Sequence, residues 1–174
     1  GETFFWGLPS LQFYPWRDYA FDQLRAGFLP LWNPYNGAGA PLFANYQSSL
    51  LYPFSWLGLI FPLSQTMSIV AVAHLFITGW GMWRFAGLLG FSTLGRGVSA
   101  LAFALSAYLM ARLGTYPVIQ VVTWLPWMAW AALRVLEKGR PRAAGGLAIF
   151  TGLMLLGGHA QTAWYSIGLG GALT

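Results

Sequence analysis

Few side chains in this sequence could take part in acid–base chemistry, and they fall in separate stretches of the chain. Three of the four carboxylates, Glu2, Asp18 and Asp22, precede the long apolar runs. His159 follows two glycines, and Arg112 separates two apolar runs. A carboxylate beside a hydroxyl can act as a general base, and a guanidinium can bind phosphate oxygens through two hydrogen bonds. These residue types indicate acid–base or phosphate chemistry wherever the fold brings them together.

The composition is that of an integral membrane protein. Charged residues make up 7% of the chain and hydrophobic residues 57%, whereas a globular domain has about 25% charged residues. The net charge of +5 comes from residues that flank apolar runs, so it indicates membrane orientation and excludes binding to nucleic acid. The chain has no cysteine, which excludes disulfides and thiolate metal sites.

Residues 1–64 form an aromatic, proline-rich segment that we assign as the first of two regions. An amphipathic helix is predicted over residues 17–26, with Gly27 as a left-handed C-terminal cap. Its inward residues are expected to be Tyr19, Leu24 and Phe28. The prolines and glycines of residues 28–45 predict a loop without a regular ladder. Residues 47–61 are too short for a membrane span of about 20 residues, and predict an interfacial or re-entrant helix.

Residues 65–174 form the second region, a single membrane domain. Uncharged runs at 65–83, 97–111 and 116–133 predict three spanning helices. The uncharged stretch from residue 143 to the end is too long for one span, and Gly-Gly-His-Ala-Gln at 157–161 predicts a break between a fourth and a fifth helix. The expected fold is therefore an all-α, polytopic membrane protein with about four to five spans, as a fragment of a longer chain.

The cations predict the orientation of these spans. The 84–96 connection has two cations and no acid, and the 134–142 connection has four cations and one acid. The positive-inside rule places both connections in the cytoplasm. Residues 1–64, the 112–116 turn and the break at His159 are then expected together on the outer face. An outer pocket that combines carboxylates, an imidazole and a guanidinium is the main functional signal from the residues alone.

Several long motifs resemble one family. QFYPWRDYAFDQLRAGFLPLWNPYNGAGAPLFANYQSSLLYP at 12–53, His74 with Gly-Trp-Gly-Met-Trp at 79–83, Trp-Leu-Pro-Trp at 124–127 and Gly-Gly-His-Ala-Gln are similar to the N-terminal half of YfhO-type bacterial membrane proteins. The resemblance covers most of the 174 residues. YfhO-type proteins are in turn similar to C-type (GT-C) glycosyltransferases, in which the first outer loop usually supplies the catalytic carboxylate.

The resemblance implies a protein of the bacterial cytoplasmic (inner) membrane that transfers a sugar from a polyprenyl-phosphate donor to an extracytoplasmic acceptor. Asp18 and His159 are the expected catalytic residues. The expected substrate-binding residues are Arg112, Trp16, Asn45, Gln47 and Gln161. The implied partners are membrane lipid and the polyprenyl-phosphate donor. The resemblance implies no definite cofactor, and it leaves open whether the enzyme uses a divalent metal.

One position departs from the family pattern. Relatives that resemble this chain read Gly-Asp before the QFYPW run, whereas this chain has Gly7-Leu8. Leucine cannot act as a base or a metal ligand. Either Asp18 or Glu2 takes the role, or this branch has changed or lost the chemistry.

Each candidate residue also has a structural interpretation. A carboxylate in the first turn of a helix, as at Asp18, offsets the helix dipole, and Arg112 could simply extend its charge to the membrane surface. Asn45 and Gln47 could satisfy turn backbone. For His74, in the middle of a span, a structural hydrogen bond to a neighbouring helix is the favoured interpretation.

Two other functions stay open on the sequence. The first is a non-catalytic membrane subunit of a larger complex. The presence of Leu8 in place of the usual aspartate, and the small number of carboxylates, favour this function. The second is a lipid or polymer transporter, which would require a continuous polar path through the spans.

Overall fold

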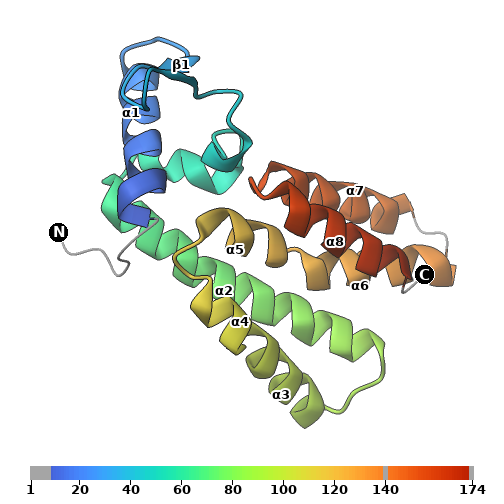
Figure 1. Ribbon diagram of the computed structural model, residues 1–174. Coiled ribbons are helices and arrows are strands. Elements are labelled where there is room, and N and C mark those ends of the chain that lie inside the picture. The colour runs from blue at the N-terminus through green and yellow to red at the C-terminus, as the bar shows by residue number, and fades with distance from the viewer. Residues whose placement is uncertain (1–8, 139–140, 173–174) are drawn as a thin grey trace.

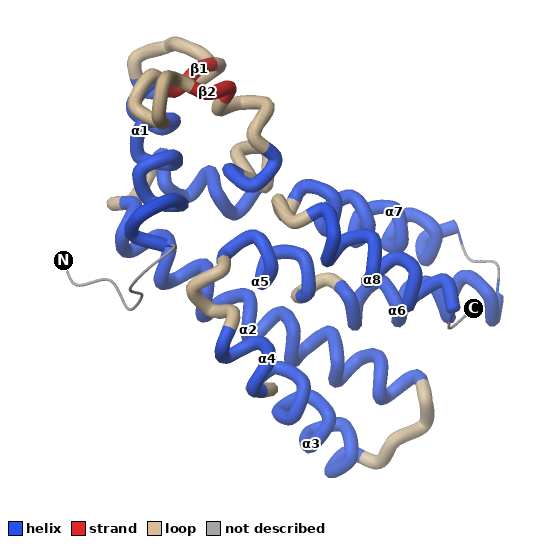
Figure 2. Tube along the Cα trace, viewed as in Figure 1, coloured by secondary structure: helices blue, strands red, loops and turns tan. Residues whose placement is uncertain are grey.

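The computed structural model describes residues 9–138 and 141–172, and these form a bundle of helices with a smaller lobe at one end (Figure 1). The lobe contains α1 and a short hairpin, and the bundle contains α2 to α8 (Figure 2). Over the described residues the fold is mostly helical, as the long uncharged runs predict.

The lobe begins with a π-helical turn at Pro9–Phe13 and continues into α1, Tyr14–Arg25. The helix begins three residues before the predicted start. Pro15 is compatible with this start, because a residue in the first turn of a helix needs no N–H for the helical ladder. Gly27 has φ +83° and provides the predicted left-handed end. Tyr19 and Leu24 pack against the core. The prediction for Phe28 is wrong: its side chain is 65% exposed, because the chain has left the helical path at Gly27.

The loop after α1 is more regular than predicted. Strands β1, Trp32–Asn33, and β2, Ala40–Pro41, pair antiparallel, although the prolines and glycines predicted no ladder. The turn between them depends on positive φ at Gly37 and Gly39. A Cβ on Gly39 would lie 2.6 Å from the indole nitrogen of Trp32, so glycine allows that ring to lie against the turn.

Two 3₁₀ helices connect the hairpin to the bundle. They span Tyr46–Ser48 and Pro53–Leu59, so residues 47–61 contain short helical pieces in place of one continuous helix, and the predicted interfacial or re-entrant position stays a prediction. Neither is long enough to cross a bilayer.

The bundle contains three helical stretches that are long and apolar enough to cross a membrane, by length and composition. The first is α2, Leu63–Leu88. The second is α3, Thr93–Ala104, continued by α4, Ala107–Ala111. The third is α5, Tyr116–Val122, continued by α6, Leu125–Lys138. All three include the predicted runs.

The second and third stretches are interrupted at points that the sequence analysis missed. The side chain of Ser106 accepts a hydrogen bond from the Leu109 N–H and starts a new helix at α4. Pro126 has no N–H to donate to the carbonyl of Val122, so the helix cannot continue unchanged from α5 into α6.

The predicted break near His159 is confirmed. Helix α7 spans Pro141–Leu156, and α8 spans Ala160–Ala172. These helices have 16 and 13 residues, which is shorter than a full crossing of about 20 residues. The structure therefore supports three crossings by length and composition, and the predicted four to five stay a prediction.

Successive helical stretches (α2, α3 with α4, α5 with α6, α7 and α8) alternate in direction, so their connections fall at two ends of the bundle (Figure 1). The α1 lobe, the α4–α5 turn and the α7–α8 break lie at one end, which we call the lobe end. The α2–α3 and α6–α7 connections lie at the other, which we call the arginine end. The lobe shares a core with the bundle, in which Phe13 of the π-helical turn and Phe21 of α1 pack with Met67 of α2 and with Tyr116. This shared core fixes α1 on the bundle.

Candidate functional site

Two adjacent serines connect α1 to the α7–α8 break. The carbonyl oxygen of Ser48 accepts a hydrogen bond of 3.3 Å from Nε of Arg17 on α1. The hydroxyl of Ser49 donates a hydrogen bond of 3.0 Å to the carbonyl of Gly157 at the break. Ser49 has φ +52°, a left-handed conformation that is uncommon for a residue other than glycine. The two serines therefore hold the lobe against the break from opposite sides of one turn.

The glycines of the break are required for this contact. The hydroxyl of Tyr46 also donates to the carbonyl of Leu155, so the loop bonds to the last turn of α7 as well. A Cβ on Gly157 would lie 2.8 Å from Val121, and one on Gly158 would lie 2.9 Å from the carbonyl oxygen of Tyr46. Side chains at these positions would separate the loop from the bundle.

Arg17 is a buried cation beneath this contact. Its side chain is 3% exposed, and its guanidinium donates to Oε1 of Gln120 at 3.4 Å and lies 5.5 Å from the centre of the Tyr116 ring. Burial lowers the pKa of Arg17 to about 10, so the group stays charged at neutral pH. The ring and the two acceptors compensate part of the desolvation cost. Within the residues that the structure describes, Arg17 makes no ion pair.

Gln120 has an unusual environment for a residue inside a helical bundle. Its Oε1 accepts from Arg17, so its Nε2 points away, and no residue that the structure describes gives this buried nitrogen a hydrogen-bond partner. An unpaired buried amide costs about 1–3 kcal/mol. Arg17 and Gln120 therefore form a buried polar contact between α1 and α5 at the lobe end.

A second polar cluster joins the loop at Tyr52 to α2 and to the junction of α5 and α6. Nδ1 of His74 lies 2.6 Å from the carbonyl of Val70, which can only accept, so this nitrogen carries the proton. Nε2 therefore accepts from the hydroxyl of Tyr52 at 2.6 Å, and that hydroxyl accepts from the indole N–H of Trp124 at 2.9 Å. Burial raises the pKa of Tyr52, so the hydroxyl stays protonated. His74 is fully bonded, which agrees with its structural interpretation.

We expect phenylalanine at position 52 to lower the free energy of unfolding by about 2 kcal/mol. The substitution keeps the ring but leaves Nε2 of His74 and the indole N–H of Trp124 buried without partners, and each such group costs about 1–3 kcal/mol. Thermal denaturation of Tyr52→Phe, followed by far-ultraviolet circular dichroism in detergent, measures the change. Tyr165→Phe is the control, because Tyr165 is 68% exposed. Equal destabilisation by the two substitutions would contradict the assigned cluster.

Asp18 lies on the outer stripe of α1. Residues 14, 18 and 22 are four apart and share one face of the helix, while Arg17 points to the core. Burial raises the pKa of Asp18 above its ordinary value of 3.8, and the nearby charge of Asp22 adds to the rise. Asp22 forms an exposed ion pair with Arg25 at 3.1 Å. Asp18 is therefore the better candidate for a base.

His159 and Gln161 are engaged in local bonds. Nδ1 of His159 accepts from the backbone N–H of Thr162 at 3.2 Å and lies 2.7 Å from the Thr162 hydroxyl. This is the geometry of an N-cap for α8. Gln161 donates to the hydroxyl of Tyr165 one turn later, at 3.0 Å. Both contacts use Nδ1, so His159 can cap α8 while its Nε2 stays available at the break.

The loop candidates are also partly structural. Oδ1 of Asn45 accepts from the backbone N–H of Gln47 at 3.1 Å and caps the first 3₁₀ helix. The side chain of Gln47 accepts from Gln12 at 3.2 Å and is exposed. Trp16 packs edge-on against Phe13, with ring centres 6.2 Å apart, and is partly buried. Gln47 is thus the most accessible of the three for a ligand.

Arg112 makes its side-chain contact with a different part of the chain from the other candidate residues. Its guanidinium is exposed and lies 5.9 Å from the centre of the Tyr108 ring on the preceding turn. The described side chains of Asp18, Arg112 and His159 share no hydrogen bond or ion pair with one another. The structure places all three at the lobe end but does not join them directly.

The candidate Glu2, and Leu8 where the chain departs from the family pattern, lie outside the described residues. Within residues 9–138 and 141–172, no three His, Asp or Glu side chains come together in a group that could hold a metal ion.

Three residues that organise the lobe end, Arg17, Gln120 and Ser49, were not predicted from the sequence as site residues. A signal for Arg17 was present: it lies three and four residues before Ala20 and Phe21, on the buried stripe of α1. An arginine on an apolar stripe indicates a buried cation with a specific partner.

Comparison with protein-family models, curated proteins and solved structures finds no match. The function must then be inferred from the residues at the lobe end.

Proposed function

We propose that this protein is a membrane glycosyltransferase of the GT-C type, which uses a sugar carried on polyprenyl phosphate. The contact through Ser48 and Ser49 is the observation that carries the proposal. It brings the helix of Asp18 to the break that contains His159, in a chain with three helices suited to a membrane. The motif resemblance to YfhO-type proteins supports the same reaction.

In this proposal the groups have distinct roles. Asp18 takes the proton from the acceptor hydroxyl, and its raised pKa brings it closer to the operating pH of a general base. The hydroxyl oxygen then attacks the anomeric carbon, and the bond from that carbon to the donor phosphate breaks. Arg112 binds the phosphate oxygens that carry the released charge. Gln47 and the Nε2 of His159 bind sugar or acceptor hydroxyls.

Arg17 acts through position rather than contact. Its bonds to Ser48 and Gln120 hold α1 against α5, and Asp18 is the next residue in the same helix. Its fixed charge also raises the positive potential at the lobe end, which favours an anionic donor.

The test is a transfer assay with the purified complete protein in nanodiscs. A radiolabelled sugar on polyprenyl phosphate is supplied with membrane or cell-wall acceptors, and the expected result is labelled acceptor and free polyprenyl phosphate. The lipid-linked donor without protein is the control. Absence of transfer with every donor and acceptor offered would reject the enzymatic function.

A second candidate is a non-catalytic subunit of a membrane complex. Asn45 and His159 both cap helices, which favours a structural role for them. Stable co-purification with other membrane proteins, without any transfer activity, would support this alternative.

A further inference from the structure

The arginine end contains a polar pocket that the proposed function does not use. It encloses about 240 Å³ and is lined by Arg84 of α2, Arg96 of α3 and Arg134 of α6, with Trp83, Gly87 and Trp130 between them. These helices meet at the end of the bundle opposite the α1 lobe (Figure 1). Three guanidiniums therefore converge on one cavity from three helices.

These guanidiniums are held in place but are not neutralised. Those of Arg84 and Arg134 lie 5.0 Å and 5.6 Å from the centre of the same Trp130 ring. Nε of Arg96 donates to the carbonyl of Phe91 at 3.0 Å. Among the side chains that the structure describes, none of the three forms an ion pair. Three neighbouring cations repel one another, so a bound anion would relieve a cost that is already present.

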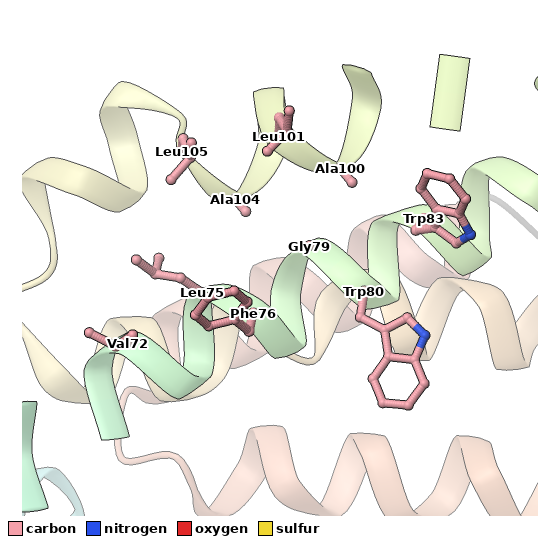
Figure 3. Close-up of a pocket in the computed structure, with 10 residues that line it drawn as sticks. All are labelled: Val72, Leu75, Phe76, Gly79, Trp80, Trp83, Ala100, Leu101, Ala104 and Leu105. Atoms are coloured by element: carbon pink, nitrogen blue, oxygen red, sulfur yellow. The ribbon is translucent and has the colours of Figure 1, made fainter. Parts of the chain in front are cut away.

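An apolar groove of about 610 Å³ begins beside this pocket and runs between α2 and α3. Trp83 lines both cavities. Figure 3 shows Ala100 and Ala104 of α3 facing α2 near Gly79. A Cβ on Gly79 would lie 3.4 Å from the Cβ of Ala104, so small residues let the helices approach closely at the floor of the groove.

The groove lies on the least covered part of the bundle. Only 11% of the apolar window in 93–111 is buried within the protein, so this stretch faces its surroundings. In a membrane those surroundings are acyl chains. The ring of Trp83 at the junction is the side-chain type that prefers the headgroup level, between an apolar groove and a charged pocket.

We propose that the pocket and the groove together bind one anionic phospholipid. Its phosphate is held by Arg84, Arg96 and Arg134, because guanidiniums bind phosphate oxygens in pairs. One of its acyl chains lies along the groove from Trp83 towards Val72. Charge complementarity selects the anionic headgroup, and basic pockets between spanning helices commonly bind such lipids. This site is at the opposite end from the proposed sugar-transfer site and does not depend on it.

Native mass spectrometry of the complete protein in detergent tests the proposal. Dioleoyl phosphatidylglycerol is expected to remain bound in preference to dioleoyl phosphatidylcholine. Arg84→Gln and Arg134→Gln are each expected to weaken phosphatidylglycerol binding by about tenfold, as for the loss of one charge-assisted hydrogen bond. Arg142→Gln is the matched control, since Arg142 is exposed and does not line the pocket. An equal loss in the control would show diffuse attraction and overturn the site.

A variant that keeps the net charge tests whether lipid binding depends on the shape of the pocket. Gly87 lines the pocket within α2, and a Cβ there would lie 3.0 Å from Cζ of Arg96. Gly87→Leu fills the cavity without changing the net charge, and Arg96 must leave its bond to Phe91 to admit the new side chain, so circular dichroism is used to check that the variant folds. We expect it to weaken phosphatidylglycerol binding at least as much as Arg84→Gln does. Unchanged binding would overturn the pocket.

A third arm distinguishes a lipid from free phosphate. Inorganic phosphate at the same concentration as phosphatidylglycerol is expected to leave the lipid bound, because phosphate has no chain for the groove. Full displacement by inorganic phosphate would overturn the lipid assignment in favour of an anion pocket alone.

Discussion

Asparagine in place of Asp18 is expected to lower the rate of sugar transfer by at least about 100-fold. A positioned general base contributes about 10²–10⁴ to the rate, and the amide of asparagine cannot take a proton. The substitution changes the shape of the side chain little, so the fold is expected to stay intact. The assay is the transfer of labelled sugar by Asp18→Asn and by the unchanged protein under the same conditions.

The matched control for this variant is Asp22→Asn. Asp22 is exposed and paired with Arg25, so its substitution is expected to change the rate by no more than about twofold. If Asp18→Asn retains the full rate, Asp18 has no part in the mechanism.

The dependence on pH gives a second readout for the same base. Burial, and then the charge of Asp22, raise the pKa of Asp18 above 3.8. Because the base acts when deprotonated, kcat/KM is expected to rise with pH through this raised pKa, and Asp22→Asn should shift the rise to lower pH.

The contribution of Asp18 to stability changes with pH in the opposite direction. The fold favours the protonated form, so the unfolding free energy relative to Asp18→Asn falls as pH rises through the same pKa.

Alanine at position 158 is expected to lower the free energy of unfolding by about 3 kcal/mol. Gly158 has φ +90°, which costs a residue with a Cβ about 1–2 kcal/mol. The new Cβ would also lie 2.9 Å from the carbonyl oxygen of Tyr46 and against Ser49, and such overpacking costs about 1–3 kcal/mol. Thermal denaturation of Gly158→Ala in detergent, followed by circular dichroism, measures the change.

Gly152→Ala is the control for the glycine substitution. Gly152 lies within α7, and a Cβ there has no neighbour within 4 Å. We expect no loss of stability, and a gain of up to about 1 kcal/mol from the better helix former. If the two variants have the same melting temperature, the contact between the loop and the break contributes little to the fold. Because that contact also carries the proposed site, Gly158→Ala should lose transfer activity as well.

The helices of the bundle could be predicted because their signals are local. Long uncharged runs predict α2, α3 and α5 with α6, and the glycines at 157 and 158 predict the break before α8. Gly27 predicts the end of α1 for the same reason, since only glycine accepts that backbone conformation without cost.

The contacts of the site could not be predicted because their partners are distant in the chain. Arg17 bonds Gln120, and Ser49 bonds Gly157, across 103 and 108 residues. No local pattern pairs such residues. The left-handed conformation of Ser49 could not be predicted either, because it depends on contacts that hold the loop from both α1 and the α7–α8 break. His159 was predicted at the break, but its role as a helix cap follows from its bond to Thr162.

The long-range bond between Arg17 and Gln120 also sets the order in which the protein can assemble. A ribosome adds about 5–20 residues per second, so roughly 5–20 seconds pass after α1 is made before its partner on α5 exists. Throughout that interval the guanidinium must stay hydrated, since burial without its acceptors is costly. We therefore expect the lobe to complete its docking only after α5 has been made, although its apolar contacts with α2 can form earlier.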